Sequence, residues 1–129
     1  MKDIIFDNFQ NDVDESLLRH RSILDIMTKL NESNARVTRA LAKSVTNCGC
    51  IEISAKKQNT FNTDNSLNPS LSTQIEGILC DNCRDIIDTE IGNNIFYLTS
   101  LCNCLDLNLY DILLKEENKL NLLGKFTFR

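Results

Sequence analysis

Cysteine is the residue type with the clearest chemical potential in this chain, because its six copies occur as three close pairs. The pairs are Cys48 with Cys50, Cys80 with Cys83, and Cys102 with Cys104. Thiolates bind zinc, and structural zinc sites are often built from four of them. A Cys-x-x-Cys pair beside a Cys-x-Cys pair is a moderately specific signal of such a site. The candidate ligands for Zn²⁺ or another soft metal are therefore Cys48, Cys50, Cys80 and Cys83.

Helix geometry sets a condition on this site. Cys80 and Cys83 are three residues apart, so they share one face at the start of an expected helix. On a regular helix Cys48 and Cys50 would point about 200° away from each other. Binding of one metal by both pairs therefore requires Gly49 to break the helix.

Composition and charge limit the functions and the cellular locations that we expect for this chain. The net charge of −4 and the lack of a dense Lys/Arg stripe argue against a protein that mainly binds nucleic acid. Residues 1 to 10 contain Asp3 and Asp7 and no continuous apolar stretch, so we expect no secretion signal and no membrane span there. The expected location is the cytoplasm, where disulfides seldom persist.

Two other roles are open for the cysteines besides metal binding. Free cysteines are often buried as small core residues, and this is what we expect of Cys102 and Cys104. Redox pairing of Cys80 with Cys83 is the other role, although no thioredoxin-like βαβ pattern surrounds them.

Glu90 is the carboxylate with the most informative position. At about 100° per residue it projects toward the apolar side of its helix, between Cys83 and Leu101. A carboxylate aimed at a core takes up a proton, pairs with a cation or coordinates a metal. A small rotation of the helix would instead make Glu90 a solvated boundary residue.

The elements that would position these side chains are helices. Apolar residues recur every three or four positions in four segments: 14 to 30, 33 to 55, 72 to 104, and 108 to 124. Residues 56 to 71 are polar, include Pro69 and read as a loop. Because β-branched residues do not alternate, we expect no strand. The prediction is an all-α, four-helix bundle with a long third helix, in one domain over residues 1 to 129.

The stretch from Glu90 to Leu98, the turn from Leu105 to Leu109 and the last helix resemble the third and fourth helices of MazG-like proteins. These proteins belong to the all-α nucleotide pyrophosphohydrolase group. The resemblance covers about residues 84 to 123. It implies a metal-dependent enzyme that uses Mg²⁺ or Mn²⁺ to cleave a nucleoside triphosphate into monophosphate and pyrophosphate.

The same resemblance assigns roles to single residues. In the family, pairs of acids on the second and third helices bind Mg²⁺. Glu90 takes the place of the first acid of the third-helix pair and is therefore the implied metal ligand, and Asn93 takes the place of the second acid. On the second helix Asn47 and Cys50 stand where the family has its acids, and Glu52 is the nearby carboxylate. The implied catalytic set is Glu90, Asn93 and Glu52, and the implied nucleotide contacts are Lys119 and Asn121.

Two hypotheses about function follow. The first is a MazG-like nucleotide pyrophosphohydrolase. The second is a non-catalytic helical module, stabilised by a cysteine-bound zinc, that binds a nucleotide or a partner protein. Under either hypothesis the family resemblance implies a homodimer, and Phe96 on an otherwise polar helix face is the expected contact.

Overall fold

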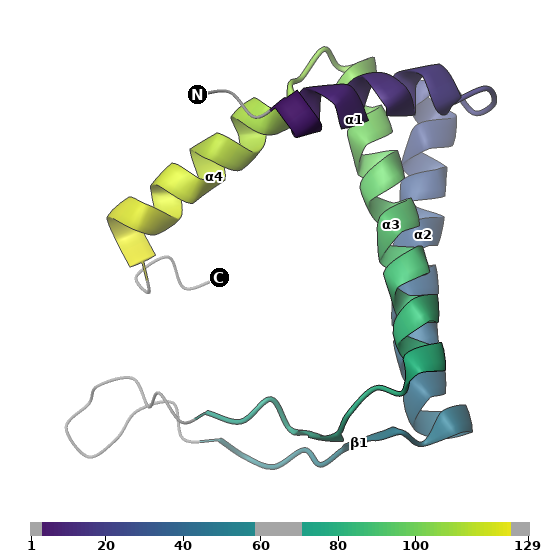
Figure 1. Cartoon of the computed structure of the whole chain (residues 1–129), viewed down its shortest axis with the longest axis vertical. Coiled ribbons are helices and arrows are strands. Elements are labelled where there is room, and N and C mark those ends of the chain that lie inside the picture. Colours follow the sequence, from purple (N-terminus) through teal and green to yellow (C-terminus); the bar gives the residue numbers. More distant parts are fainter. Residues whose placement is uncertain (1–3, 59–70, 125–129) are drawn as a thin grey trace. The chain divides into compact units, whose positions relative to one another are not determined.

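The computed structural model describes residues 4 to 58 and 71 to 124. Its elements in chain order are α1 (Ile4–Ser16), α2 (Ile23–Lys43), the π-helical turn η1 (Ser44–Cys48), β1 (Ile51–Ile53), β2 (Ile75–Gly77), α3 (Asp81–Cys104) and α4 (Leu109–Leu123) (Figure 1). Four α-helices and one small two-stranded sheet confirm the predicted all-α class among the described residues. None of these helices is long and apolar enough to cross a membrane.

The last helix lies where the sequence predicted it. Asn108 is the N-cap, and its side chain accepts a hydrogen bond from the Asp111 backbone N–H at 2.9 Å. Gly124 ends the helix with a φ of 54°, and its N–H donates to the Leu120 carbonyl. Both termini carry residues that cap helices through local hydrogen bonds, which is why the sequence revealed them.

The first predicted helix, over residues 14 to 30, is wrong in its bounds, because residues 17 to 22 are not helical and α2 continues past residue 30 to Lys43. α1 ends at Ser16, α2 begins at Ile23, and His20 between them has a left-handed backbone with a φ of 56°. The Arg21 side chain donates to the carbonyls of Asp14 and Leu17 and forms an ion pair with the Asp14 carboxylate at 3.1 Å. These bonds satisfy carbonyls at the end of α1. The spacing of apolar residues carries no information about such bonds, so it did not predict where α1 ends.

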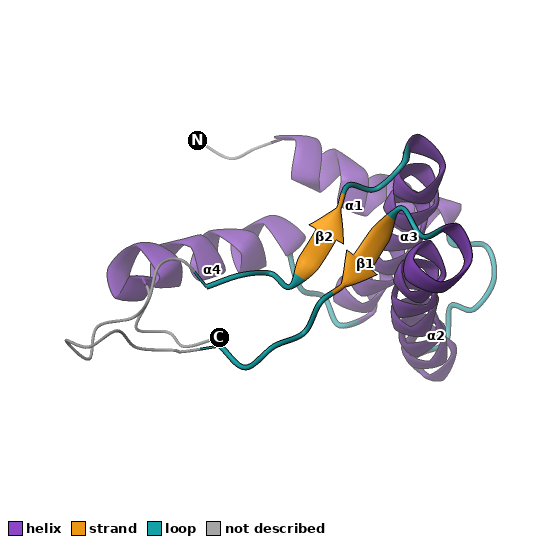
Figure 2. Cartoon of the chain, turned by 90° about the horizontal axis from the view of Figure 1, so that it is seen from below, coloured by secondary structure: helices purple, strands orange, loops and turns teal. Residues whose placement is uncertain are grey.

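The segment preceding α3 also differs from the prediction. α3 begins at Asp81 rather than at residue 72, and residues 75 to 77 form β2. The second predicted helix likewise gives way to β1 before residue 55. The strands pair antiparallel, with Ile51 opposite Gly77, Glu52 opposite Glu76, and Ile53 opposite Ile75 (Figure 2). Strands of three residues are too short to show alternation, so the sequence pattern matched a helix instead.

The predicted loop at 56 to 71 falls mostly outside the described residues. The described residues of this segment, 56 to 58 and 71, are neither helix nor strand. That part of the prediction is confirmed, and residues 59 to 70 lie outside the described part of the chain.

The chain forms two compact units, and the boundary between them runs through α2 and α3. One unit comprises residues 1 to 35 with 91 to 129, and the other comprises residues 36 to 90. Four of the buried apolar side chains belong to the first unit, namely Val13, Leu17, Ile26 and Cys102. In the second unit the buried apolar side chains among the described residues are Ile51 and Cys83. The described residues of the second unit therefore supply little apolar core.

Polar contacts add to the packing of the first unit. The buried Gln10 amide donates to Asn103 Oδ1 at 2.9 Å and to the Leu107 carbonyl at 2.7 Å, and its oxygen accepts from Leu109 N at 2.8 Å. A buried side chain with all of these partners is well satisfied, and it ties α1 to the turn that precedes α4.

Candidate metal centre

The Cys48 and Cys50 pair lies where η1 ends and the sheet begins. Cys48 is the last residue of η1, and Gly49 follows with a φ of 76°. The Gly49 N–H donates to the Ser44 carbonyl at 2.9 Å, which closes the helical turn. This left-handed conformation suits glycine, because it lacks a Cβ atom. Gly49 therefore breaks the helix as the predicted site requires, and the chain continues through Cys50 into β1.

The Cys80 and Cys83 pair lies at the start of α3. Cys80 precedes the first helical residue, and its sulfur accepts a hydrogen bond from the Cys83 backbone N–H at 3.4 Å. The Arg84 N–H donates to the Cys80 carbonyl at 2.9 Å and completes the first turn. Cys80 thus acts as an N-cap, where the positive end of the helix dipole favours a thiolate.

Gly77, which no sequence motif singled out, allows the two cysteine pairs to come together. Gly77, the last residue of β2, has a φ of 90°. A Cβ atom at this position would lie 2.5 Å from the Cys50 carbonyl oxygen. The close approach of β2 to Cys50 therefore depends on glycine. No local motif marks this glycine, because the approach follows from how β1 and β2 pair.

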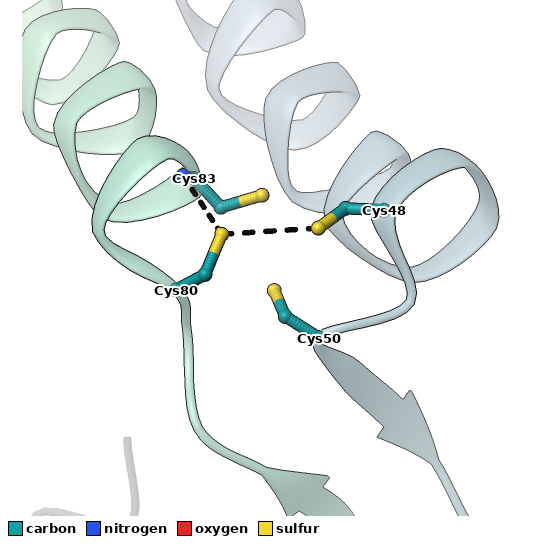
Figure 3. Close-up of side chains that lie close together, drawn as sticks. All are labelled: Cys48, Cys50, Cys80 and Cys83. Carbon is teal, nitrogen blue, oxygen red and sulfur yellow. Dashed lines mark hydrogen bonds between the residues drawn. The ribbon is translucent and has the colours of Figure 1, made fainter.

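The four sulfur atoms converge on one point (Figure 3). All of them lie within 4.8 Å of one another, and the sulfurs of Cys48 and Cys80 are 3.8 Å apart. Tetrahedral zinc with Zn–S bonds of about 2.3 Å places its sulfurs about 3.8 Å apart. The S–S bond of a disulfide is about 2.05 Å long, so these sulfurs are too far apart for one, and all four cysteines are free thiols. The arrangement fits a metal ion bound by four thiolates.

The thiols differ in acidity because their surroundings differ. The hydrogen bond from the Cys83 backbone N–H, together with neighbouring thiols, lowers the pKa of Cys80 to about 7. A side-chain hydrogen bond with Ser44 lowers the pKa of Cys83, but burial and the other three cysteines outweigh it and raise that pKa to about 12. Cys80 therefore ionises before Cys83, and Cys83 keeps its proton until a cation compensates the charge.

Four sulfur ligands complete the coordination of a tetrahedral metal. Catalytic zinc sites keep one position for water or substrate, whereas sites with four protein ligands are structural. Among the described residues, these cysteines are the one group of three or more metal-ligating side chains that lie together. The chemistry that this geometry supports is stabilisation of structure by a metal.

Glu90 is partly buried, as its helical position predicted. Its side chain is 16% exposed and accepts a hydrogen bond from Arg36 Nε at 3.1 Å. Pairing with a cation was one of the predicted outcomes for an inward carboxylate. Asn93 is exposed on α3, and Glu52 is exposed on β1 opposite Glu76. The catalytic roles of Glu90, Asn93 and Glu52 stay predictions.

The other predicted residues lie in the first unit. Lys119 pairs with Glu116 at 3.4 Å on α4, and Asn121 is exposed on the same helix. Cys102 is buried, in agreement with a packing role, and burial raises the pKa of its thiol. Cys104 is exposed, so the expectation that it packs in a core is wrong.

Comparison with protein-family models, curated protein sequences and solved structures finds no match to this chain. The resemblance to MazG-like proteins therefore stays a prediction.

Proposed function

We propose that this protein is a non-catalytic helical module held together by a zinc ion at Cys48, Cys50, Cys80 and Cys83. The convergence of the four sulfurs carries the proposal. The ion would supply the cross-link that joins the end of η1 to the start of α3. The same cross-link would close the base of the two-stranded sheet, because Cys50 directly precedes β1 and Cys80 follows shortly after β2.

The small number of buried apolar side chains in the second unit supports a stabilising role for the zinc ion. Its described residues bury only Ile51 and Cys83 as apolar side chains, which is little for a unit of this length. Structural zinc contributes about 10–16 kcal/mol of apparent binding free energy in small metal-dependent domains. An ion at the cysteines would therefore supply much of the stability that a larger apolar core would otherwise provide.

The module is suited to binding another molecule rather than to chemistry. A centre with four thiolates has no open position for a substrate. Apolar side chains around the sheet are exposed, with Ile53 59%, Ile75 48% and Ile78 79% accessible. Exposed apolar residues that gather in one region often mark a protein contact. The zinc ion would hold this surface in a fixed conformation for a partner protein.

A homodimer remains part of the proposal, with a change in the residues that support it. Phe96 is half-buried and packs edge-on against Tyr97, with ring centroids 5.2 Å apart. Ile91, Ile95 and Leu98 are each more than two-fifths exposed and follow one another at helical spacing on α3. This stripe, rather than Phe96, is the better candidate for contact with a second copy.

Elemental analysis of the full chain, purified without added metal, tests the zinc proposal. We expect one zinc per chain, and loss of that zinc in Cys80→Ser and in Cys83→Ser. Cys104→Ser is the matched control, because Cys104 is an exposed thiol outside the cluster. A folded protein that carries no zinc and takes up none from solution would exclude the proposal.

The pyrophosphohydrolase hypothesis is the second candidate, and the inward position of Glu90 is the observation that favours it. If it holds, the protein releases pyrophosphate from a nucleoside triphosphate in the presence of Mg²⁺ or Mn²⁺, and Glu90→Gln abolishes the release. No release across a panel of nucleotides would eliminate this hypothesis.

A further inference from the structure

The small sheet of the second unit has an unpaired edge on each of its two strands (Figure 2). Within the part of the chain that the structure describes, β1 and β2 pair only with each other. A lone pair of strands is marginally stable in water, and three or more strands are usually needed for independent stability. An extended segment of another protein can supply the further strand by pairing with a free edge.

The free edge of β1 offers backbone groups for such pairing. The Ser54 N–H donates to the Gln74 carbonyl at 2.9 Å, so these two residues form a hydrogen-bonded pair of the antiparallel ladder. Hydrogen-bonded and non-hydrogen-bonded pairs alternate along such a ladder, so Ile53 opposite Ile75 is a non-hydrogen-bonded pair. The N–H and C=O groups of Ile53 therefore point away from β2, toward the free edge of β1.

The free edge of β2 is less suited to pairing. By the same alternation the Ile75 N–H points away from β1, but it donates to the Thr73 side-chain oxygen at 3.4 Å. Gln74 has a φ of 62°, which interrupts the extended backbone directly before β2. A further strand would therefore pair with β1 rather than with β2.

The two faces of the sheet differ in their chemistry. On one face Glu52 lies directly opposite Glu76, and both side chains are exposed. Like charges placed directly across a sheet are destabilising, and neither carboxylate forms an ion pair with a described residue. On the other face Ile53 lies opposite Ile75, and these side chains are 59% and 48% exposed. A strand added to this sheet would therefore meet carboxylates on one face and apolar side chains on the other.

We propose that the free edge of β1 binds an extended segment of a partner protein in which basic and apolar side chains alternate. This inference rests on the partner-binding role proposed above, and it names the chemistry of the partner. Successive side chains of a strand point to opposite faces of a sheet. Alternation would place the basic side chains beside Glu52 and the apolar ones beside Ile53. The added cations would also relieve the repulsion between Glu52 and Glu76.

A second copy of this chain is a poor occupant of the same edge. Antiparallel pairing of two β1 strands would place Glu52 and Glu76 of both copies on one face of the joint sheet. Four carboxylates gathered there would repel one another, and charged side chains on an edge oppose pairing between like strands. The charge of this sheet therefore favours a basic partner over a second copy.

Fluorescence polarisation of a labelled peptide tests this inference on the full chain as purified. The probe peptide alternates lysine and valine, and its control has the same composition with the lysines and valines in separate blocks. We expect saturable binding of the alternating peptide, and at least about tenfold weaker binding to Glu52→Gln/Glu76→Gln, since charge-assisted contacts are lost. Glu15→Gln/Glu117→Gln removes two exposed carboxylates of the other unit and is the matched control for total charge. We expect this control variant to bind like the unmodified protein.

Ile53→Pro tests the backbone contact, and Ile53→Ala is its matched control. Both substitutions remove the isoleucine side chain, but only proline also removes the N–H that points to the free edge. Proline is tolerated on edge strands where the N–H faces outward, so β1 and β2 should stay paired. We expect Ile53→Pro to bind the alternating peptide about threefold to tenfold more weakly than Ile53→Ala, because one hydrogen bond is lost.

Four results would overturn the inference. They are no binding of the alternating peptide at millimolar concentration, equal binding of the block peptide, and an equal loss of affinity in the two double variants. The fourth is a dimer that persists in Ile53→Ala and dissociates in Ile53→Pro, since a second copy would then occupy the edge.

Zinc content, measured on every sample, separates this inference from the proposed metal centre. If zinc is present and the alternating peptide does not bind, the inference fails and the metal centre stands. If zinc is absent and the peptide binds with the expected losses in the variants, the metal centre fails and the inference stands.

Discussion

Single residues decide whether the two cysteine pairs can share a metal, and Gly77 is the least obvious of them. A Cβ atom there would lie 2.5 Å from the Cys50 carbonyl oxygen, and the φ of 90° is itself unfavourable for other residues. Gly77→Ala must therefore push β2 away from Cys50. We expect it to cost about 1–3 kcal/mol of stability and to weaken zinc binding.

Gly92→Ala is the control for that substitution. Gly92 lies within α3, and a Cβ atom there would meet no other atom within 4 Å. Alanine in a helix interior is about 1 kcal/mol more favourable than glycine, so this variant should be slightly stabilised. Chemical unfolding of both variants, with zinc content measured on the same samples, gives the comparison. Equal stability and zinc content in the two variants would contradict the role assigned to Gly77.

The acidity of the thiols leads to a prediction about pH. Metal binding requires thiolates, so protons compete with zinc for the sulfur atoms. The pKa of Cys80 is about 7, and the pKa of Cys83 is about 12. Zinc binding displaces a proton from Cys83 throughout the neutral pH range. It displaces a proton from Cys80 only below about pH 7, because above that pH Cys80 is already a thiolate. Apparent zinc affinity should therefore fall as the pH falls, and more steeply below about pH 7.

Competition with a coloured chelator between about pH 6 and pH 8 measures this dependence. Cys104→Ser is the control and should show the same dependence on pH, because Cys104 is an exposed thiol outside the cluster. An affinity that does not change with pH would show that thiolates are not the ligands.

At the scale of elements, α4 is the helix that its own sequence defines best. The Asn108 side chain caps it through a 2.9 Å bond to Asp111 N, and we expect Asn108→Ala to cost about 1 kcal/mol of stability. Asn118→Ala is the control, because Asn118 is exposed within the same helix. Denaturant unfolding of the two variants tests the cap. A loss in Asn118→Ala as large as in Asn108→Ala would show that the cap is not the cause.

Elements with local signals were predictable, and elements defined by distant contacts were not. Asn108 and Gly124 mark the ends of α4 in the sequence, because a capping residue bonds to residues close to it in the chain. The pairing of Ile51 with Gly77 brings together residues far apart in the chain, and three-residue strands leave no periodic trace. The spacing of Ile75 and Leu79 matched a helix equally well, so the start of α3 was predicted too early.

The cysteine cluster shows the same division between local and distant signals. The residue types and spacing predicted which four cysteines would meet, together with the break at Gly49 that allows it. The sequence could not show that Gly77 packs against Cys50, because that contact depends on the strand register. Nor could it show that Glu90 pairs with Arg36, since the partner comes from another helix.

At the scale of the whole molecule, the two units differ in what holds them together. The first unit buries Gln10 in a network of hydrogen bonds and has four of the buried apolar side chains. Residues 36 to 58 and 71 to 90 of the second unit contribute two such side chains and the cysteine cluster. Removal of the metal should therefore affect the second unit far more than the first.

Hydrogen exchange of the full chain, before and after treatment with a strong zinc chelator, tests this difference. We expect amide protection to fall in η1, β1, β2 and the first turn of α3, because the ion that joins these elements has gone. Protection in α4 should persist, since its cap and the Gln10 bond to Leu109 N contain no metal ligand. Uniform loss of protection along the chain would mean that the metal stabilises both units. Unchanged protection in η1 and the two strands would mean that the cysteines hold their positions without a metal.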